Sequence, residues 1–401
     1  MSAANNRHVD VALAYKSGVP AARLTRERAG ITFAYLADYT GPALATNLPV
    51  DAKPIHLAGG ALPPFFSGLL PEGRRLTAIR QATKTSADDE LSLLLTVGAD
   101  TVGDVQVLPD GTPPTAEQEP ATEPARPLAE SDFHELFARA VGPELADRTA
   151  IAGAQDKVSG RMISLPLSYM DAAWILKFDP PDFPHLVANE AFFLTAARAS
   201  GLRTAEAEVV HDRRGQPGLL VRRFDRTARD GRTVSLAQED ACQVLGRYPA
   251  DKYRLTTDEV VQGLSAKTGA PVVAARTLLQ QFAFAYLTCN GDAHGKNFSI
   301  LHDGQEWGVA PAYDLPSTFP YRDGTMALTL NGKDREDIGR ADFVAIGERC
   351  GVPAKATARV LNELVAAAPT WLERLSELPF DQRRVHKLEK ACRYRIGRLD
   401  V

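Results

Sequence analysis

The chain has 401 residues, of which 44% are hydrophobic and 24% charged, with a formal net charge of −4 and a pI near 6.1. This length exceeds what one hydrophobic core usually holds, so we expect two or three packed units. The charge lacks the basic excess typical of direct nucleic-acid binding, which argues against direct DNA contact. No apolar run approaches the length of a membrane span, and residues 1–8 lack a hydrophobic signal core. We therefore predict a cytoplasmic protein without membrane contact.

The four cysteines are scattered along the chain at Cys242, Cys289, Cys350 and Cys392, and no two of them form a Cys-x-x-Cys pair. This spacing indicates neither a zinc site nor a disulfide framework. Reduced thiols are expected, as is usual for the cytoplasm.

The first part of the chain favours a β-rich subdomain followed by a linker. Short strands of a β meander are predicted at residues 9–15, 22–25 and 31–36. Residues 88–97 are leucine-rich and predict a helix. Proline and small polar residues dominate residues 109–127, which have too little apolar content to fold alone. We place an N-terminal subdomain at residues 1–108 and a linker at residues 109–131.

A second unit is predicted to begin with a helix at Asp132. Residues 132–226 mix strand and helix patterns, whereas residues 227–401 are mainly helical. Helical patterning covers residues 238–245, 257–266, 272–287, 343–350, 354–368 and 381–398. The predicted fold class is α+β: a small mixed α/β N-lobe and a mostly helical C-lobe, preceded by the β-rich N-terminal subdomain.

The most informative motif is NGDAHGKN at residues 290–297, followed by AYD at residues 312–314. A protein kinase needs one Asp to orient the attacking hydroxyl, an Asn five positions later on a metal ion, and a second Asp downstream on the same metal. Asp292, Asn297 and Asp314 fit these three roles. Magnesium keeps much of its water, so Asn297, Asp314 and the phosphates of ATP would suffice as ligands.

The same octapeptide is also compatible with an ordinary polar loop, because Asn, Gly, Asp and His are common loop formers. Its flanks favour the functional interpretation. A helical apolar run at residues 278–288 enters the loop and a strand-like run at residues 298–301 leaves it, which is the order found in a bilobal kinase-like fold. Within the loop, Lys296 could place a positive charge against the transferred phosphate, and His294 could brace the loop by hydrogen bonding.

A kinase also requires a lysine on an N-lobe strand that holds the ATP phosphates, and a glutamate that pairs with it. Lys177 lies in the strand-like residues 174–178, and Glu190 lies near the start of a helical pattern at residues 189–197. The alternatives are a solvent-facing strand lysine and an acid that only complements the helix dipole.

Two further segments are candidates for nucleotide contacts. The apolar residues 218–221 run into Arg222 and Phe224, where an interlobe hinge would present backbone groups to adenine; simple core packing of Phe224 is the alternative. A small-residue turn ahead of the strand-like residues 158–163 would let backbone N–H groups approach phosphate. This turn comprises Ala152, Gly153, Ala154, Gln155, Asp156 and Lys157.

Together these segments resemble the HipA family of bacterial toxin serine/threonine kinases from type II toxin–antitoxin systems. The resemblance rests on residues 65–73, residues 89–94 with Gly98 and Gly103, residues 153–155, the Lys177 strand, residues 223–226, residues 292–297 and residues 313–314. It implies that Asp292 is the catalytic Asp, that Asn297 and Asp314 bind Mg²⁺, that Lys177 contacts the phosphates of ATP, and that residues 152–157 cover them. The implied protein target is an aminoacyl-tRNA synthetase. The implied partner is a helix-turn-helix antitoxin similar to HipB, through which the chain would contact DNA only indirectly.

The chain departs from the family pattern at one regulatory position. Family members generally autophosphorylate a serine just before the Ile-Ala-Gly turn, and this position is Ala150 here. A replacement role for Thr149, an engineered change and the loss of this control are alternatives that the sequence leaves open.

Three functions are compatible with the sequence. The first is a toxin kinase that transfers the γ-phosphate of ATP to a serine or threonine of a cytosolic protein. The second is a small-molecule phosphotransferase of kinase-like fold. The third is a scaffold that acts as a co-repressor with a DNA-binding antitoxin. The N-terminal segments at residues 65–73 and 89–103 favour the first over the second, and the complete set of catalytic residues disfavours a pure scaffold.

Overall fold

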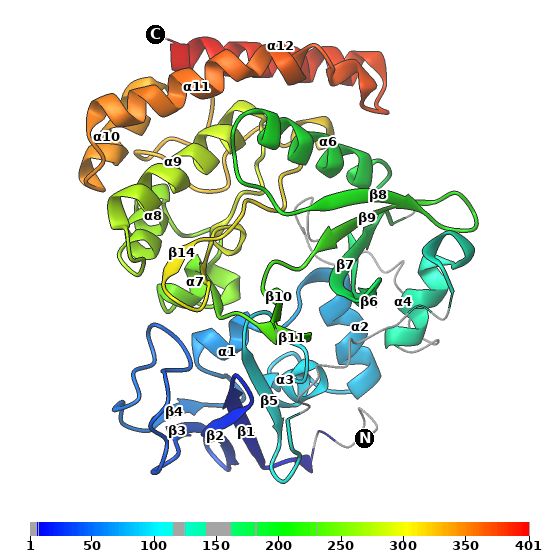
Figure 1. Ribbon diagram of the computed structural model, residues 1–401, viewed down its shortest axis with the longest axis vertical. Helices are drawn as coiled ribbons and strands as arrows, with labels where there is room; N and C mark the ends of the chain where they lie inside the picture. The colour runs from blue at the N-terminus through cyan, green and yellow to red at the C-terminus, as the bar shows by residue number, and fades with distance from the viewer. Residues whose placement is uncertain are drawn as a thin grey trace.

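The structure is a computed structural model that describes residues 6, 8–114, 124, 126–141, 162–180, 183–229 and 231–400. Figure 1 shows an N-terminal sheet with short helices beside it at one end of the molecule and a group of helices at the other. A second sheet lies between these ends, beside the strands β10 to β14. The architecture is the mixed α/β, bilobal arrangement expected from the sequence.

The first sheet has five antiparallel strands in the order β4-β3-β2-β1-β5. The strands are β1 (Val11–Lys16), β2 (Val19–Glu27), β3 (Gly30–Tyr35), β4 (Ile55–Ala58) and β5 (Val105–Pro109), and the helices beside them are α1 (Pro64–Gly68), α2 (Gly73–Thr83) and α3 (Glu90–Val97). Phe33, Phe66 and Leu94 form part of their buried core. The predicted meander and the predicted helix are confirmed. The sequence did not predict β4 or β5, and β5 ends at the first residue of the predicted linker.

The second sheet has four antiparallel strands in the order β6-β7-β9-β8. The strands are β6 (Ile163–Tyr169), β7 (Ala172–Phe178), β8 (Ala207–His211) and β9 (Pro217–Arg222), flanked by α4 (Phe133–Val141) and α6 (Leu186–Ala199). Alternation along β9 places Leu220 in the core with α4 and Leu219 in the core with α6. The sheet is therefore covered on both faces, and the side chains that alternate with Leu176 on β7 face α6.

The helical lobe surrounds α9, whose Phe282, Ala283 and Tyr286 are fully buried. Its helices are α7 (Ala241–Val244), α8 (Thr257–Ser265), α9 (Pro271–Leu287), α10 (Arg340–Arg349), α11 (Ala354–Leu372) and α12 (Gln382–Asp400). Its strands are β10 (Arg226–Arg229), β11 (Arg232–Ser235), β12 (Gln238–Asp240), β13 (Ser299–His302) and β14 (Trp307–Val309). Short 3-10 helices lie at η2 (Leu128–Glu130), η4 (Pro249–Asp251), η5 (Gly295–Asn297), η6 (Phe319–Tyr321) and η7 (Leu375–Glu377).

One helix prediction was wrong in part. The helical pattern over residues 238–245 is divided into β12 and α7. The side chain of Asp240 accepts a hydrogen bond from the Gln243 backbone and so caps the start of α7. Residues 238–240 pair instead with β13, about sixty positions later in the chain. The pattern of neighbouring residues in the sequence does not indicate this long-range strand pairing.

Buried ion pairs join the N-terminal subdomain to the strand that leads out of the second sheet. The guanidinium groups of Arg223 and Arg226 contact the Asp100 carboxylate at 2.6 Å and 3.0 Å. Both also donate to the Thr101 carbonyl. The carboxylate of Asp225, which binds the same two arginines, accepts from the Gly103 backbone at 2.9 Å. The segment RFDR is thus used for docking the N-terminal subdomain.

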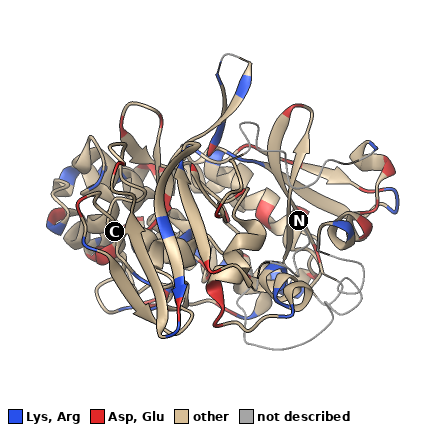
Figure 2. Ribbon diagram, turned by 90° about the horizontal axis from the view of Figure 1, so that it is seen from below, with Lys and Arg blue, Asp and Glu red and all other residues tan. Residues whose placement is uncertain are grey.

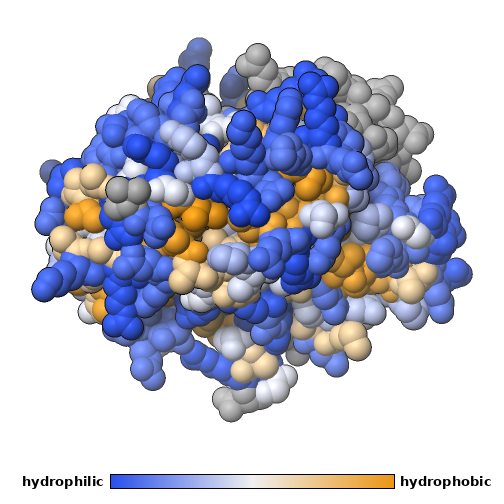
Figure 3. All heavy atoms as spheres, turned by 90° about the horizontal axis from the view of Figure 1, so that it is seen from above, coloured by the Kyte–Doolittle hydropathy of each residue, from blue (hydrophilic) through white to orange (hydrophobic). Residues whose placement is uncertain are grey.

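Residues of both charges are spread along the described chain. Figure 2 shows Lys and Arg interspersed with Asp and Glu. Figure 3 shows that the face over α11 and α12 is mostly hydrophilic, with hydrophobic patches between hydrophilic side chains. Among the residues described, none of the helices combines the length and the apolar character needed to cross a membrane.

Candidate active site

The loop after α9 is held in a fixed shape by its own polar groups. The Asn290 side chain accepts a hydrogen bond from the Asp292 backbone N–H at 3.0 Å. The Asn297 amide donates to the Asp292 carbonyl at 2.8 Å. Asp292 is fully buried and Asn297 is 8% exposed. The five-residue spacing therefore closes one tight loop, in which the amide nitrogen of Asn297 is already bonded and its oxygen can face a cation.

Lys177 joins the second sheet to two carboxylates. Its ammonium lies 2.7 Å from Glu190 on α6 and 3.0 Å from Asp314, which follows β14. Burial disfavours the charged lysine, but Asp314 and Glu190 outweigh it and raise the pKa of Lys177. Burial raises the pKa of Glu190 to about 7, with Lys177 opposing and Asp314 reinforcing the shift. The structure thus brings together the lysine and the glutamate that the sequence paired, and adds Asp314 to them.

Asp314 itself has a backbone conformation that few non-glycine residues adopt, with φ at 57°. One oxygen of its carboxylate binds Lys177. The other oxygen has no hydrogen bond to any residue that the structure describes. Asn297 and Asp314 line the same pocket, so two oxygen donors suited to Mg²⁺ face one space. No group of three His, Cys, Asp or Glu side chains in the described ranges could form an all-protein metal cage, and Mg²⁺ bound with water and phosphate needs none.

Tyr253 is a site residue that the sequence did not indicate. Its hydroxyl donates to the Asp292 carboxylate at 2.6 Å. Burial, reinforced by Asp292, strongly raises the pKa of Tyr253, so the phenol stays protonated and remains a donor. The contact joins residues 39 positions apart, and a tyrosine in a loop carries no local signal of such a role.

His294 packs against Tyr253 and was expected to brace the loop by hydrogen bonding. The two rings meet edge to face with centroids 5.0 Å apart. Neither ring nitrogen of His294 has a hydrogen-bond partner among the described residues. Burial, and next the nearby Lys252 ammonium, lower the pKa of His294, which keeps the imidazole neutral. The observed contact of His294 with Tyr253 is a ring contact.

Lys296 lies against the N-terminal subdomain. Its ammonium is 2.8 Å from the Asp240 carboxylate and donates to the Gly68 carbonyl at 3.0 Å. Glu72 is 4.0 Å from Lys296 and 2.6 Å from Lys252. Burial disfavours the charged form, but Asp240 and Glu72 outweigh it and raise the pKa of Lys296. The end of α1 and the segment before α2 therefore contact the loop of residues 290–297, through residues more than two hundred positions apart.

Lys177, Lys296, Asn297 and Asp314 line a pocket of about 330 Å³ with walls from all three parts of the chain. Asp292 and Glu190 are bonded to two of these lining residues, Asn297 and Lys177. Gly68 and Asp100 come from the N-terminal subdomain, and Lys177 comes from the second sheet. Apolar side chains of Met162 and Ile175 line the same space, which suits the flat, weakly polar face of a nucleotide base.

Other predicted residues lie outside this pocket. Arg222 is half exposed and pairs with Glu206 on the surface at 2.9 Å. Phe224 packs against Tyr313, with ring centroids 5.5 Å apart, as its core-packing alternative predicted. The turn from Ala152 to Lys157, together with Thr149 and Ala150, lies outside the described residues.

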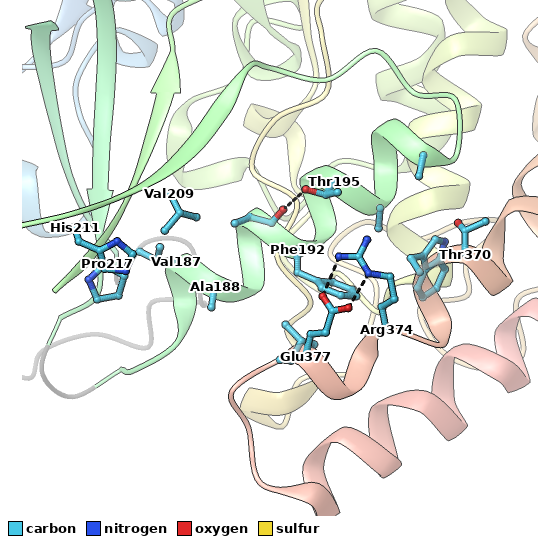
Figure 4. Close-up of a pocket in the computed structure, with 15 residues that line it drawn as sticks. Val187, Ala188, Phe192, Thr195, Val209, His211, Pro217, Thr370, Arg374 and Glu377 are labelled. Carbon is cyan, nitrogen blue, oxygen red and sulfur yellow. Dashed lines mark hydrogen bonds and ion pairs between the residues drawn. The ribbon is translucent and has the colours of Figure 1, made fainter. Parts of the chain in front are cut away.

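A larger hollow of about 400 Å³ lies between α6, β8 and α11 (Figure 4). Its walls are mostly apolar, and Figure 4 shows the exposed ion pair of Arg374 and Glu377 at its side, at 2.8 Å. His211 lies at the far side beside Pro217. This arrangement lacks the convergent acids, amide and lysine of the smaller pocket, so size alone does not identify the reactive site.

Comparison with known proteins gives a consistent result. Residues 149–372 match the model of the HipA-like C-terminal domain, and residues 12–108 match that of the HipA N-terminal domain. The chain belongs to the HipA family.

Individual relatives agree with this assignment. The Y4mE protein of Sinorhizobium fredii is 32% identical over 94% of this chain and 96% of its own length. The serine/threonine-protein kinase toxin HipA of Shewanella oneidensis is 28% identical over 84% of this chain and 83% of its own. A solved structure of the Shewanella HipA, HipB and operator DNA complex matches with a TM-score of 0.75 at 23% identity, covering 97% of both chains. This match shows the HipA fold.

Proposed function

We propose that this HipA-family chain is an ATP- and Mg²⁺-dependent protein serine/threonine kinase. The observation that carries the proposal is that Lys177, Asn297 and Asp314 line one pocket. Glu190 is paired with Lys177, and Asp292 is hydrogen-bonded to Asn297. Each group has the chemistry that phosphoryl transfer requires, in which positioning and charge stabilisation supply most of the rate.

In the proposed reaction, the acceptor hydroxyl oxygen attacks the γ-phosphorus while the bond to the β–γ bridging oxygen breaks and ADP leaves. Asp292 accepts the hydroxyl proton, and the hydroxyl of Tyr253 holds its carboxylate in position. Lys177 binds nucleotide phosphate, and Glu190 orients it. Bound Mg²⁺ would neutralise phosphate charge, held by the oxygens of Asn297 and Asp314.

The contacts of Lys296 support a different role from direct contact with the transferred phosphate. Its ammonium is already paired with Asp240 and bonded to Gly68. We therefore assign Lys296 to bracing the catalytic loop, and His294 to packing behind Tyr253.

We further propose that the acceptor is a cytosolic protein, an aminoacyl-tRNA synthetase, whose modification slows translation. The proposed partner is a HipB-like helix-turn-helix antitoxin that neutralises the kinase and gives it indirect contact with DNA. The Shewanella complex of HipA, HipB and operator DNA supports this partner class. The net charge of −4 supports an indirect rather than direct role at DNA.

The proposal is tested by phosphate transfer from labelled ATP with Mg²⁺ into a bacterial lysate, with labelled proteins identified by mass spectrometry. The Asp292→Asn variant serves as the matched control. We expect a labelled synthetase that is absent with the variant. Labelling of small molecules alone would contradict a protein kinase, and ATP binding without any transfer would favour the co-repressor scaffold.

A further inference from the structure

One cation in the active-site pocket differs from the others. Four Lys or Arg side chains line the described pocket: Arg75, Lys177, Arg223 and Lys296. The last three each lie within 3.0 Å of a carboxylate oxygen. The guanidinium of Arg75 makes neither a hydrogen bond nor an ion pair with any residue in the described ranges. A partly buried cation without a partner is costly unless a ligand supplies the missing negative charge.

The neighbours of Arg75 leave its charge uncompensated. Asp100 and Asp225 are already bound by Arg223 and Arg226. Three guanidinium groups therefore face two carboxylates, and one positive charge is left over. Burial, reinforced by Arg223 and opposed by Asp100, lowers the pKa of Arg75 to about 10. The part of the pocket around Arg75 therefore carries an uncompensated positive charge that can bind an anion.

The fold places Arg75 near the proposed phosphate site. Arg75 lies on α2, which packs against the edge strand β6. Ser164 of β6 lines the pocket and is the cross-strand partner of Lys177. Cross-strand partners share one face of a sheet, so Ser164 and Lys177 project from the same face, into the pocket that Arg75 also lines.

We propose that Arg75 of the N-terminal subdomain binds a phosphate group of the nucleotide. The inference rests on the proposed kinase function and adds a binding residue from outside the two kinase lobes. The guanidinium presents a planar fork of donors that matches two phosphate oxygens. The N-terminal subdomain is thereby part of the nucleotide site, in addition to supporting the catalytic loop.

The test measures binding of ATP, ADP, AMP and adenosine to the full chain with Mg²⁺ by calorimetry. The variants are Arg75→Gln, Arg75→Lys and, as a control, Arg23→Gln, which changes a half-exposed arginine of the same subdomain. We expect Arg75→Gln to weaken ATP binding by about tenfold or more, because a charge-assisted bond to phosphate is lost. Adenosine should bind all variants equally, and Arg75→Lys should restore part of the ATP affinity.

Three outcomes would overturn the inference. An equal loss of ATP and adenosine affinity in Arg75→Gln would mean that Arg75 only maintains the structure. Unchanged nucleotide affinity with a raised KM for the protein acceptor would place the anion on the acceptor. Unchanged nucleotide affinities and an unchanged KM for the protein acceptor would show that Arg75 does not bind an anion. Absence of nucleotide binding by the unaltered chain would reject the proposed kinase function as well.

Discussion

Lys177 and Lys296 are both nearly buried, and each lies close to two carboxylates, yet their surroundings differ. Lys177 contacts Glu190 and Asp314, and Asp314 lines the pocket. Lys296 contacts Asp240 and lies near Glu72, and it also donates to the Gly68 carbonyl of another subdomain. The contacts of Lys177 can be exchanged for contacts with Mg²⁺ and ATP, whereas the contacts of Lys296 join two parts of the fold. A buried lysine beside two acids is therefore not sufficient evidence of a catalytic role. The decisive difference is whether one of the paired carboxylates can also bind Mg²⁺.

The largest effect in this comparison is expected for Asp314→Asn. It removes a charged metal ligand and a partner of Lys177, so we expect phosphate transfer to fall by about a thousandfold. Initial rates at several Mg²⁺ concentrations check this. Recovery of the full rate at ordinary Mg²⁺ would show that Asp314 is not a metal ligand.

Lys177→Met should lower transfer by about a hundredfold, because the charge beside the nucleotide phosphates is lost. Its effect on stability should depend on pH. The pKa of Glu190, already raised to about 7 from an ordinary 4.5, should rise further without Lys177. An acid whose folded pKa is raised loses stability as pH increases from its unfolded pKa to its folded pKa.

The pH dependence gives a direct measurement. Thermal unfolding should place Lys177→Met close to the unaltered chain at about pH 5 and clearly below it at about pH 8, because Glu190 ionises in the unfolded chain but keeps its proton in the folded variant. A pH-independent difference would mean that Glu190 is not the group responsible. Lys177→Met with Glu190→Gln should abolish the dependence.

Lys296→Met should act mainly on stability. Removing one partner of a buried pair typically costs about 3–5 kcal/mol, because Asp240 is left buried without its counter-charge. Denaturant unfolding measures this cost, and the double variant with Asp240→Asn should recover part of it. A variant of normal stability that cannot transfer phosphate would instead return Lys296 to the direct catalytic role that the sequence suggested.

The smallest effect is expected for Tyr253→Phe, which removes only the hydroxyl that holds Asp292. A neutral donor to a carboxylate contributes modestly, so we expect kcat to fall by about threefold to thirtyfold with little change in the KM for ATP. Steady-state kinetics separates the two constants. A raised KM with normal kcat would contradict the positioning role.

The sequence predicted those features of the fold and the site that depend on local patterns. The spacing of Asp292, Asn297 and Asp314 indicated the candidate loop, and the apolar, strand-like run around Lys177 indicated its strand. The contacts of Tyr253, Glu72, Asp240 and Arg75 were not predictable, because each links distant segments through the tertiary fold. The same reason explains β12, where pairing with β13 overrides a local helical pattern. Arg222 was wrongly predicted to line the site. It is the last residue of β9, but its side chain pairs with Glu206 on the surface.

The most direct test of the account compares turnover and nucleotide binding in one pair of proteins, the unaltered chain and Asp292→Asn. The account predicts that Mg²⁺-dependent transfer falls by about a thousandfold or more while the Kd for ATP stays within about twofold, because Asp292 serves the acceptor hydroxyl and not the nucleotide. Transfer that persists at an unaltered rate in Asp292→Asn would contradict the assignment of this loop as the catalytic centre.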